Sequence, residues 1–241
     1  MKICVIPDVH QSTHWKKVDI DAVDKVIFLG DYFDCWNNKW PDQLNNFNAI
    51  IHLKKKNMDK VDILFGNHDT SYFLNEQCSG YQFNKAMDIE EALKNACQCM
   101  QVVAIYDGWL FSHAGVSYRW MKCAGIKSVE EINKLFIEKP DYFRWVGPDA
   151  YGDNENEGCL WIRIPSLIKT AVKGYNQVVG HTEASPLRFR TSSYSKTKIL
   201  CIDSRDHSNI IELNTETGTF DCPVLHPMHT RHHPSGDPDL L

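Results

Sequence analysis

The sequence lacks any apolar run long enough to cross a lipid bilayer. It also lacks a basic excess, because 26 Lys and Arg residues are outnumbered by 31 Asp and Glu residues, for a formal net charge of -5. The composition therefore argues against nucleic acid as a partner. Met1 leads directly into a strand-like segment, without the basic, apolar and cleavage regions of a secretion signal. We expect a cytoplasmic protein that binds no membrane, and the sequence leaves its oligomeric state open.

Paired cysteines are lacking too. The nine cysteines are an odd number in a chain of 241 residues, which argues against a disulfide framework. Cys97 and Cys99 form the closest pair, but a structural zinc site needs a second pair at suitable spacing, and the sequence has none. We expect reduced thiols, with Cys4 and Cys201 buried in strands.

The chain does have the composition of an ordinary globular protein, with 43% hydrophobic and 24% charged residues. Pro41 precedes apolar positions at helical spacing, which predicts a helix over Asp42–Lys56. Short buried strands joined by helices predict a parallel sheet with helices on both faces. The predicted strands are Lys2–Ile6, Lys25–Leu29 and Val61–Phe65, and a brief helical turn is expected within Trp15–Val23.

The middle of the chain carries signals for turns and helix starts. Asp107-Gly108 predicts a hairpin between Val102–Ile105 and Trp109–Phe111. A Ser or Asp followed three residues later by Glu indicates a capped helix start. The further predictions are a helix capped by Asp88 and reaching about Cys99, helix caps at Ser117 and Ser128, and an exposed acidic loop at Asp149–Gly158.

The end of the chain predicts strands at Lys198–Ile202 and Asn209–Leu213, joined by Asp203–Ser208, and a short strand at Thr219–Phe220. Because the composition does not break, we expect one domain over residues 1–222. Two stacked sheets covered by helices would accommodate these elements. Residues 223–241, rich in Pro and His, are expected to form an extended or disordered tail.

Residue types that bind metals follow five strand-like runs. Side chains just beyond the ends of parallel strands can converge in space. Their mixed oxygen and nitrogen atoms suit two divalent cations. Each residue alone is more simply a turn former or a satisfied histidine, but five segments in series indicate a site. The segments are Asp8-Val9-His10, Gly30-Asp31-Tyr32-Phe33-Asp34, Gly66-Asn67-His68-Asp69, Ser112-His113-Ala114-Gly115 and Gly180-His181-Thr182.

Two cations held about 3.5–4 Å apart need a bridging ligand, and Asp31 is the candidate. Asp8 and His10 lie two residues apart at one strand end, so that a single turn can direct both at the first ion. His113 and His181 come from distant segments and would supply imidazole nitrogens to the second ion.

Asn67 offers a neutral amide oxygen, which limits the negative charge of the cage. A water that bridges two cations becomes a nucleophile near neutral pH, which favours in-line attack at phosphorus. His68 is the candidate acid that protonates the leaving group. Asp34 would hold the His68 tautomer and raise the pKa of the imidazole.

These segments resemble the signature of the calcineurin-like metallophosphoesterases, D-x-H, G-D-x-x-D, G-N-H-E/D, H and G-H, over roughly Lys2–Phe220. The resemblance implies an α/β fold in which two mixed β-sheets pack as a sandwich flanked by α-helices. It also implies two divalent metal ions, manganese first, with iron or zinc as alternatives. By position, Asp8, His10 and Asp31 would hold one ion, Asp31, Asn67, His113 and His181 the other, and His68 with Asp34 would donate the proton.

Within this family the chain is most similar to the bacterial and phage phosphoprotein phosphatase branch, which includes diadenosine tetraphosphate hydrolases. Leu160-Trp161-Ile162-Arg163 is similar to the Leu-Trp-x-Arg segment of that branch. The resemblance implies that Arg163 contacts phosphate, as a guanidinium fork suits phosphate oxygens, and that Asn67 also belongs to the substrate-binding residues.

Three positions depart from that branch. Asp34-Cys35-Trp36 stands where the branch has Asp-Arg-Gly, so a second phosphate-binding arginine is missing, and Arg188 or Arg190 is the candidate replacement. Asp69 replaces the commoner Glu. Glu183 stands where nuclease and cyclic-nucleotide branches have a second histidine, which argues against those branches.

We therefore expect a metal-dependent phosphoric ester hydrolase that cleaves phosphate monoesters and acts on phosphoproteins. The alternative substrate is a nucleotide or dinucleotide polyphosphate. A non-catalytic scaffold on the same fold is a rival from another class, although scaffolds usually have broken ligand sets and this series is complete. A nuclease is the third reading, and it lacks a basic groove signal.

Overall fold

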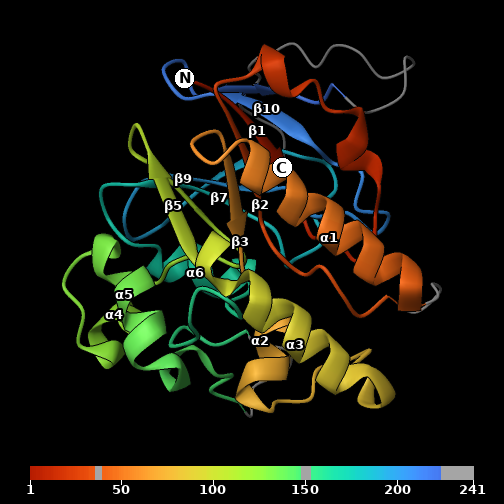
Figure 1. Cartoon of the computed structure of the whole chain (residues 1–241). Coiled ribbons are helices and arrows are strands. Elements are labelled where there is room, and N and C mark those ends of the chain that lie inside the picture. The colour runs from red at the N-terminus through yellow and green to blue at the C-terminus, as the bar shows by residue number, and fades with distance from the viewer. Residues whose placement is uncertain (36–39, 148–152, 224–241) are drawn as a thin grey trace.

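A computed structural model describes residues 1–35, 40–147 and 153–223, and its strands form the two mixed β-sheets that the sequence predicts (Figure 1). The six-stranded sheet has the order β11-β10-β1-β2-β3-β4, in which β1 to β4 run parallel. Its strands are β1 (Lys2–Ile6), β2 (Lys25–Phe28), β3 (Val61–Leu64), β4 (Met100–Gln101), β10 (Ile211–Asn214) and β11 (Thr219–Asp221).

The five-stranded sheet has the order β5-β6-β7-β9-β8, with β6, β7 and β9 parallel to one another. Its outer strands pair antiparallel with their neighbours, as do β10 and β11 in the other sheet, so both sheets are mixed. Its strands are β5 (Val103–Tyr106), β6 (Trp109–Ser112), β7 (Asn176–Val179), β8 (Phe189–Thr191) and β9 (Lys198–Cys201).

Apolar side chains between the two sheets form the centre of the sandwich. Val5 and Ile27 of the first sheet join Phe111, Val178 and Leu200 of the second in one buried cluster. Both faces of β1 are apolar, because Cys4 and Ile6 point instead into the cluster beneath the helices. Strands buried on both faces explain why the sequence reads as continuous apolar runs.

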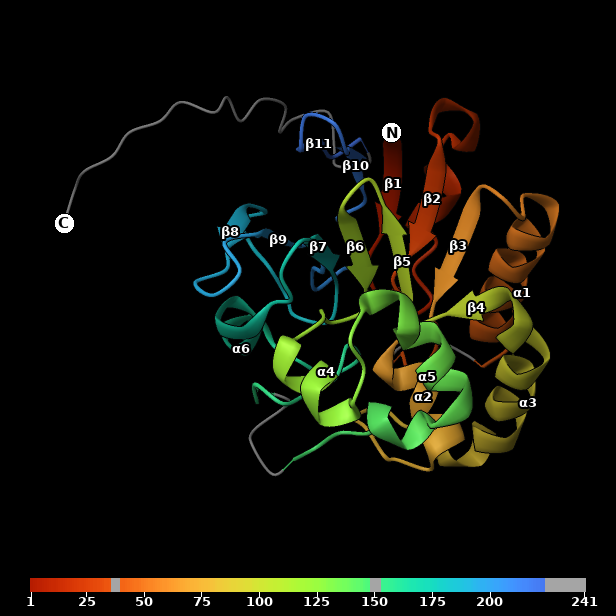
Figure 2. The ribbon, with the colours of Figure 1, turned by 90° about the vertical axis from the view of Figure 1, so that its left-hand side faces the viewer.

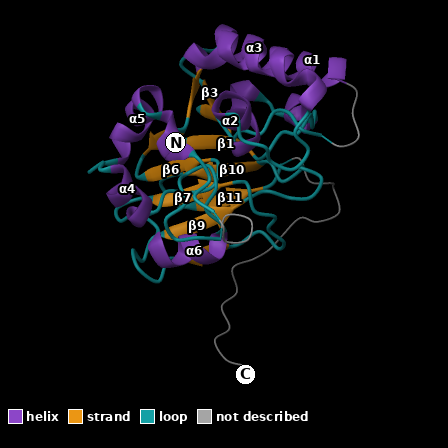
Figure 3. Ribbon diagram, turned by 90° about the horizontal axis from the view of Figure 1, so that it is seen from below, coloured by secondary structure: helices purple, strands orange, loops and turns teal. Residues whose placement is uncertain are grey.

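Helices cover the outer faces of both sheets. Figure 3 shows α1 and α3 on one side of the strands and α6 on the opposite side, and Figure 2 shows α1 and α3 beyond β3 and β4. The helices are α1 (Trp40–Lys56), α2 (Asn67–Leu74), α3 (Ala86–Ala96), α4 (Tyr118–Ala124), α5 (Ile132–Glu138) and α6 (Ile164–Thr170). Among the described residues, no helix is long and apolar enough to cross a membrane.

Most predicted local elements are confirmed. The strand at Lys2–Ile6 has the predicted bounds, and the segment Trp15–Val23 contains two short 3-10 helices. The hairpin forms around Asp107-Gly108. The Ser117 hydroxyl accepts a hydrogen bond from the Arg119 amide, and Ser128 opens a capping box. Turn and capping signals depend on a few neighbouring residues, so they can be read correctly without knowing the tertiary structure.

Two predictions are wrong in detail. The helix expected at Asp88 begins at Ala86, and the Asp88 carboxylate pairs with Lys85 instead of capping the helix. The Asp149–Gly158 run is not simply an exposed loop, because in its described part Glu157 is fully buried and accepts the amide hydrogens of Val146 and Gly147. Residues 149–152, and residues 224–241 of the expected tail, lie outside the described residues.

Candidate active site

Residues that follow five parallel strands line one cavity of about 1210 Å³. Because parallel strands of a sheet end at the same edge, these residues come together, although they are far apart in the sequence. β1 leads to Asp8 and His10, β2 to Asp31 and Asp34, β3 to Asn67 and His68, β7 to His181, and β9 to Asp203. β6 leads to His113, which is fully buried beside Asp31.

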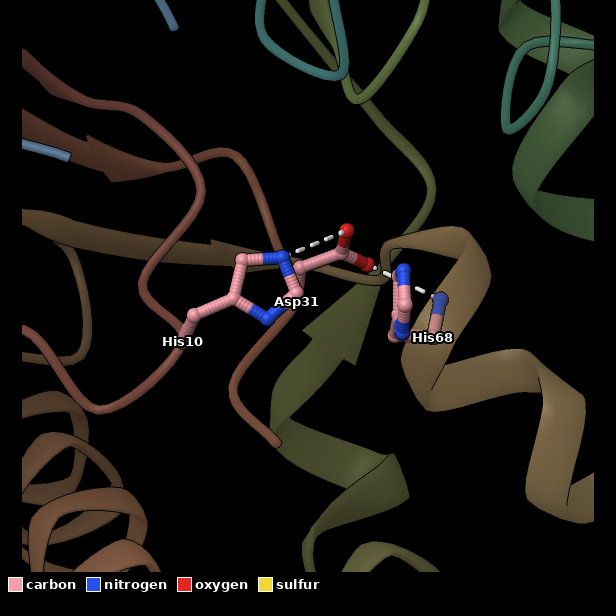
Figure 4. A group of neighbouring side chains, drawn as sticks. All are labelled: His10, Asp31 and His68. Carbon is pink, nitrogen blue, oxygen red and sulfur yellow. Dashed lines mark hydrogen bonds and ion pairs between the residues drawn. The ribbon is translucent and has the colours of Figure 1, made fainter. Parts of the chain in front are cut away.

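Asp31 lies at the centre of the predicted residues and is 1% exposed. Its Oδ2 lies 3.5 Å from Nε2 of His10 and 3.3 Å from Nε2 of His113. Its Oδ1 accepts the main-chain N–H of His68 at 2.9 Å, as Figure 4 shows beside the His10 contact. Asp8 completes a second group with Asp31 and His113. Asp31 is thus shared by two groups of ligand atoms.

The histidine rings beside Asp31 are fixed by main-chain carbonyls. Nδ1 of His10 lies 2.7 Å from the oxygen of Phe33, and Nδ1 of His113 lies 2.9 Å from the oxygen of Leu29. A carbonyl oxygen only accepts, so each Nδ1 carries a proton and each Nε2 faces Asp31. Imidazole nitrogens that converge on a carboxylate form a donor set that fits divalent cations.

Asn67 adds an amide oxygen to the same group, because its Oδ1 lies 2.8 Å from Nε2 of His113. Burial lowers the pKa of His113, so its imidazole is neutral, which is the form that binds metals. Burial would raise the pKa of Asp31, but the surrounding imidazoles, His113 first, lower it well below its usual range. The centre therefore holds an ionised carboxylate beside the neutral imidazole of His113.

Asp8 and His181 meet through the main chain. The His181 amide donates to Oδ1 of Asp8 at 2.9 Å. A side chain at position 180 would place its Cβ 2.1 Å from the same oxygen, so Gly180 is required there. Burial, followed by the charges of Asp203 and Asp31, raises the pKa of Asp8 well above its usual value.

The structure places His181 at the edge of the two ligand groups. Its ring lies 5.0 Å from that of His113, but its Nε2 lies 3.0 Å from the carbonyl oxygen of Trp161. Within the described residues, the ligand atoms that lie within 4.8 Å of one another include none from His181. Burial, followed by the Arg163 charge, lowers the pKa of His181 well below its usual value, so its imidazole is neutral. Its Nε2 carries the proton, and its Nδ1 has a lone pair that can bind a metal ion.

His68 and Asp34 form a hydrogen-bonded pair beside this centre, with Nδ1 of His68 3.0 Å from Oδ2 of Asp34. The Tyr72 hydroxyl donates to the other Asp34 oxygen. Burial opposes a charged His68, but the carboxylates of Asp31 and Asp34 raise its pKa well above the usual value. The thiol of Cys78 lies 3.3 Å from the same Nδ1. His68 therefore holds a proton next to the ligand atoms.

Backbone strain is concentrated in this site. His10, Asp31, Asp34 and His181 all have positive φ angles, from 33° to 65°, a region that side chains other than glycine rarely adopt. Such conformations persist only where surrounding contacts determine them, and they cluster at functional sites.

Asp69 organises the site without being one of the predicted ligands. Its fully buried carboxylate accepts the main-chain N–H groups of Asp31, Tyr32 and Gly66 at 2.8–2.9 Å. Burial and the Asp31 charge raise the pKa of Asp69, and these hydrogen bonds offset part of that rise. Sequence reasoning recorded Asp69 only as a replacement for Glu, although its place three residues after a helix N-cap is a capping-box signal.

Arg163 lies on the cavity wall, and its guanidinium donates to the carbonyl oxygen of His181 at 2.7 Å. Burial lowers the pKa of Arg163. Arg188 and Arg190 do not line the cavity in the described part of the chain, whereas Arg205 does. Arg205 follows β9, the strand after Arg188 and Arg190 in the chain.

Several cavity residues carry no motif and were missed. Asp203 follows β9 as the other site residues follow their strands, and that position was the one available signal. Trp145 and Trp161 lie together on the wall, with ring centroids 6.3 Å apart. The other missed residues at the cavity are Gln77, Cys78, Ser79, Arg205 and His207.

Known proteins share this fold. A cold-active protein-tyrosine phosphatase from a psychrophilic Shewanella species is 16% identical, with a TM-score of 0.57, covering 91% of this chain and 79% of its own. A protein serine/threonine phosphatase from Saccharomyces cerevisiae is 12% identical, with a TM-score of 0.52, covering 88% of this chain and 72% of its own. At these identities the likeness shows the fold. No curated protein matches the sequence.

The sequence itself matches the calcineurin-like phosphoesterase family over residues 1–185. This range includes all five of the strand-end segments that carry the motifs, the last being Gly180-His181-Thr182. Divalent metal ions are implied by this family, and the ligand groups around Asp31 are candidates to hold them. The chain therefore belongs to the calcineurin-like phosphoesterase family and is a metal-dependent phosphoesterase.

Proposed function

We propose that the chain hydrolyses phosphate monoesters at a pair of divalent cations that share Asp31. The carrying observation is the buried Asp31 carboxylate between the imidazoles of His10 and His113, with the His68–Asp34 pair beside it. Asp8 and His10 would complete one ion site, and Asn67, His113 and His181 the other. Manganese is the first candidate because the family resemblance implies it, with iron or zinc as alternatives. Carboxylate and amide oxygens suit manganese, and imidazoles suit iron and zinc.

When bound, the two cations lower the pKa of water and neutralise charge on the phosphoryl oxygens. The residues of the chain then position the substrate and move the proton. Arg163 presents a guanidinium to phosphoryl oxygens from the cavity wall. His68, which holds its proton through Asp31 and Asp34, donates it to the leaving oxygen.

A phosphoprotein is the substrate class we place first. The two protein phosphatases that share the fold support this choice. The cavity is open to the surface at Trp145, which is 46% exposed, so a side chain on a larger protein could enter it.

All nine cysteines are described and free, which supports a reducing compartment, and we extend the proposal to the cytoplasm.

A nucleotide or dinucleotide polyphosphate is the second candidate. The neighbouring Trp145 and Trp161 rings on the cavity wall favour it, because an exposed indole can stack on a base. Both candidates rely on the same centre, so they differ only in what the wall binds.

Purified protein supplied with manganese should hydrolyse 4-nitrophenyl phosphate, and elemental analysis should find two metal ions per chain. A panel of phosphopeptides, nucleotides and dinucleotide polyphosphates, compared by kcat/KM, then ranks the substrates. A correctly folded protein that is inactive with every divalent metal tested would contradict the proposal. A folded protein without a stoichiometric metal pair would support the non-catalytic scaffold instead.

A further inference from the structure

The loop between β9 and β10, residues Asp203–Ser208, reaches the cavity from the end of a parallel strand. Three of its side chains line the cavity: Asp203, Arg205 and His207. This sixth strand end matches none of the motifs, yet its position in the fold is equivalent to that of the other five.

His207 and Asp203 form a second histidine–carboxylate pair on the cavity. Nδ1 of His207 lies 3.1 Å from Oδ1 of Asp203, whose side chain is 7% exposed. The pair has the same construction as His68 and Asp34, where Nδ1 also faces a buried carboxylate. Since Nδ1 is held in this way, Nε2 is the ring atom left for another partner, and it forms no hydrogen bond within the described residues.

The loop is built to hold His207 in an unfavourable conformation. Its φ angle is 53°, in the left-handed region. The Asp206 carboxylate accepts hydrogen bonds from the hydroxyls of Ser204 at 3.0 Å and Ser208 at 2.8 Å, and the His207 amide donates to the Ser204 carbonyl at 2.8 Å. These hydrogen bonds stabilise the strained conformation of His207 and so fix the position of its imidazole.

The His207 ring is close to the reaction centre. Its centroid lies 5.0 Å from that of His10, and the His10 centroid lies 4.8 Å from that of His68. His207 is therefore next to a candidate metal ligand and in the same ring cluster as the candidate proton donor. Arg205 is exposed at the same wall and adds a cationic group.

We propose that His207, oriented by Asp203, is a further substrate-binding residue that contacts the oxygens of the phosphoryl group, with Arg205 beside it. The ligand class is a tetrahedral oxyanion, either the phosphate monoester or the inorganic phosphate product. Nδ1 of His207 lies against Asp203, which leaves Nε2 as the ring atom that faces the oxyanion. Asp203 is a positioning residue, because it acts through His207. This inference rests on the proposed function.

The test measures binding of inorganic phosphate to the manganese-loaded protein by calorimetry, and KM and kcat for 4-nitrophenyl phosphate. His207→Ala should weaken phosphate binding and raise KM by roughly tenfold, the value of one hydrogen bond between charged groups. Arg205→Gln should weaken both less. The matched controls His52→Ala and Arg188→Gln change exposed residues outside the cavity and should leave both constants unchanged.

Asp203→Asn separates positioning from a merely structural role. If Asp203 acts through His207, the double variant Asp203→Asn/His207→Ala binds phosphate no more weakly than His207→Ala alone. Elemental analysis and thermal unfolding of each variant report metal content and folding, which a positioning role leaves near wild type.

Phosphate dissociation constants within twofold of wild type in both His207→Ala and Arg205→Gln would overturn the inference. If His207→Ala does not fold, Arg205→Gln decides, since its side chain is exposed. Wild-type protein that binds no phosphate would also overturn it. Wild-type protein that binds phosphate but hydrolyses no ester would refute the proposed function, and the variants would still decide the role of His207.

Discussion

Both sheets contribute strand ends to the site, but they hold their site residues differently. On the six-stranded sheet, carboxylate side chains fix the site residues. Asp69 accepts hydrogen bonds from three main-chain amides of two loops, and Asp34 accepts hydrogen bonds from Tyr72 and His68. On the five-stranded sheet, main-chain carbonyls hold the rings of His113 and His181, as one also holds His10, and a carboxylate holds His207. The first half is a cross-linked network, whereas the second is a set of separately fixed rings.

This difference divides the tasks between the sheets. The network contains Asp31 and the His68–Asp34 pair, so both the shared ligand and the proton donor come from the six-stranded sheet. The five-stranded sheet closes the centre with His113 and forms the wall with Arg163 and the Asp203–Ser208 loop. Substitutions in the first half should therefore affect the chemistry together, and substitutions in the second half one at a time.

The largest effect should come from the residue that both halves share. Asp31→Asn removes the charge that His10 and His113 face, so both ions should be lost and turnover should fall roughly a thousandfold or more. Elemental analysis and the 4-nitrophenyl phosphate assay measure the two losses. Asp88→Asn, an exposed change on α3, is the control. Retention of both ions with full activity would remove Asp31 from the centre.

Removing one imidazole from each sheet compares the halves directly. His113→Ala should reduce activity roughly a hundredfold. It should also destabilise the fold by about 1–3 kcal/mol, because it leaves the buried Leu29 carbonyl without its donor. His10, whose side chain is 15% exposed, should cost less stability when changed to Ala. Thermal unfolding of both variants without metal tests this, and equal losses of stability would erase the difference between the halves.

His68→Ala tests the chemistry of the network. The variant should keep its metal but lose about a hundredfold in turnover on alkyl phosphates, whose leaving group needs the proton. The loss should be much smaller for 4-nitrophenyl phosphate, which has a good leaving group. An equal loss for all leaving groups would argue against His68 as the acid.

The smallest effect should come from the outer edge of the network. Tyr72→Phe removes one hydrogen bond to Asp34, worth about 0.5–1.5 kcal/mol, so kcat should fall several-fold at most. The fall should disappear in a His68→Ala background, because Asp34 then has no imidazole to orient. A persistent fall in that background would mean that Tyr72 acts by another route.

The sequence predicted the two-sheet fold and the residues that now surround Asp31, because each strand end carries its motif within a few residues. It could not predict that Lys198–Ile202 and Asn209–Leu213, neighbours in the chain, contribute strands to different sheets. Sequence pattern reports local periodicity and not which strands pair. For the same reason, Asp203 and His207 looked like an ordinary connection.

Glu157 illustrates a second limit. An acidic run reads as solvated, yet one carboxylate in it is buried because two amides from a distant segment reach it. Such partners are supplied by tertiary structure, and composition carries no trace of them.

The hydrogen bonds from His10 and His113 to main-chain carbonyl oxygens affect how the protein binds its metal ions. Since Phe33 and Leu29 orient both rings within the polypeptide alone, these two imidazoles need no ion to hold their positions. Loading then requires no refolding, and the occupant is decided by which ion is abundant during loading. Dialysis of one preparation against different salts should thus yield distinct catalysts from the same chain.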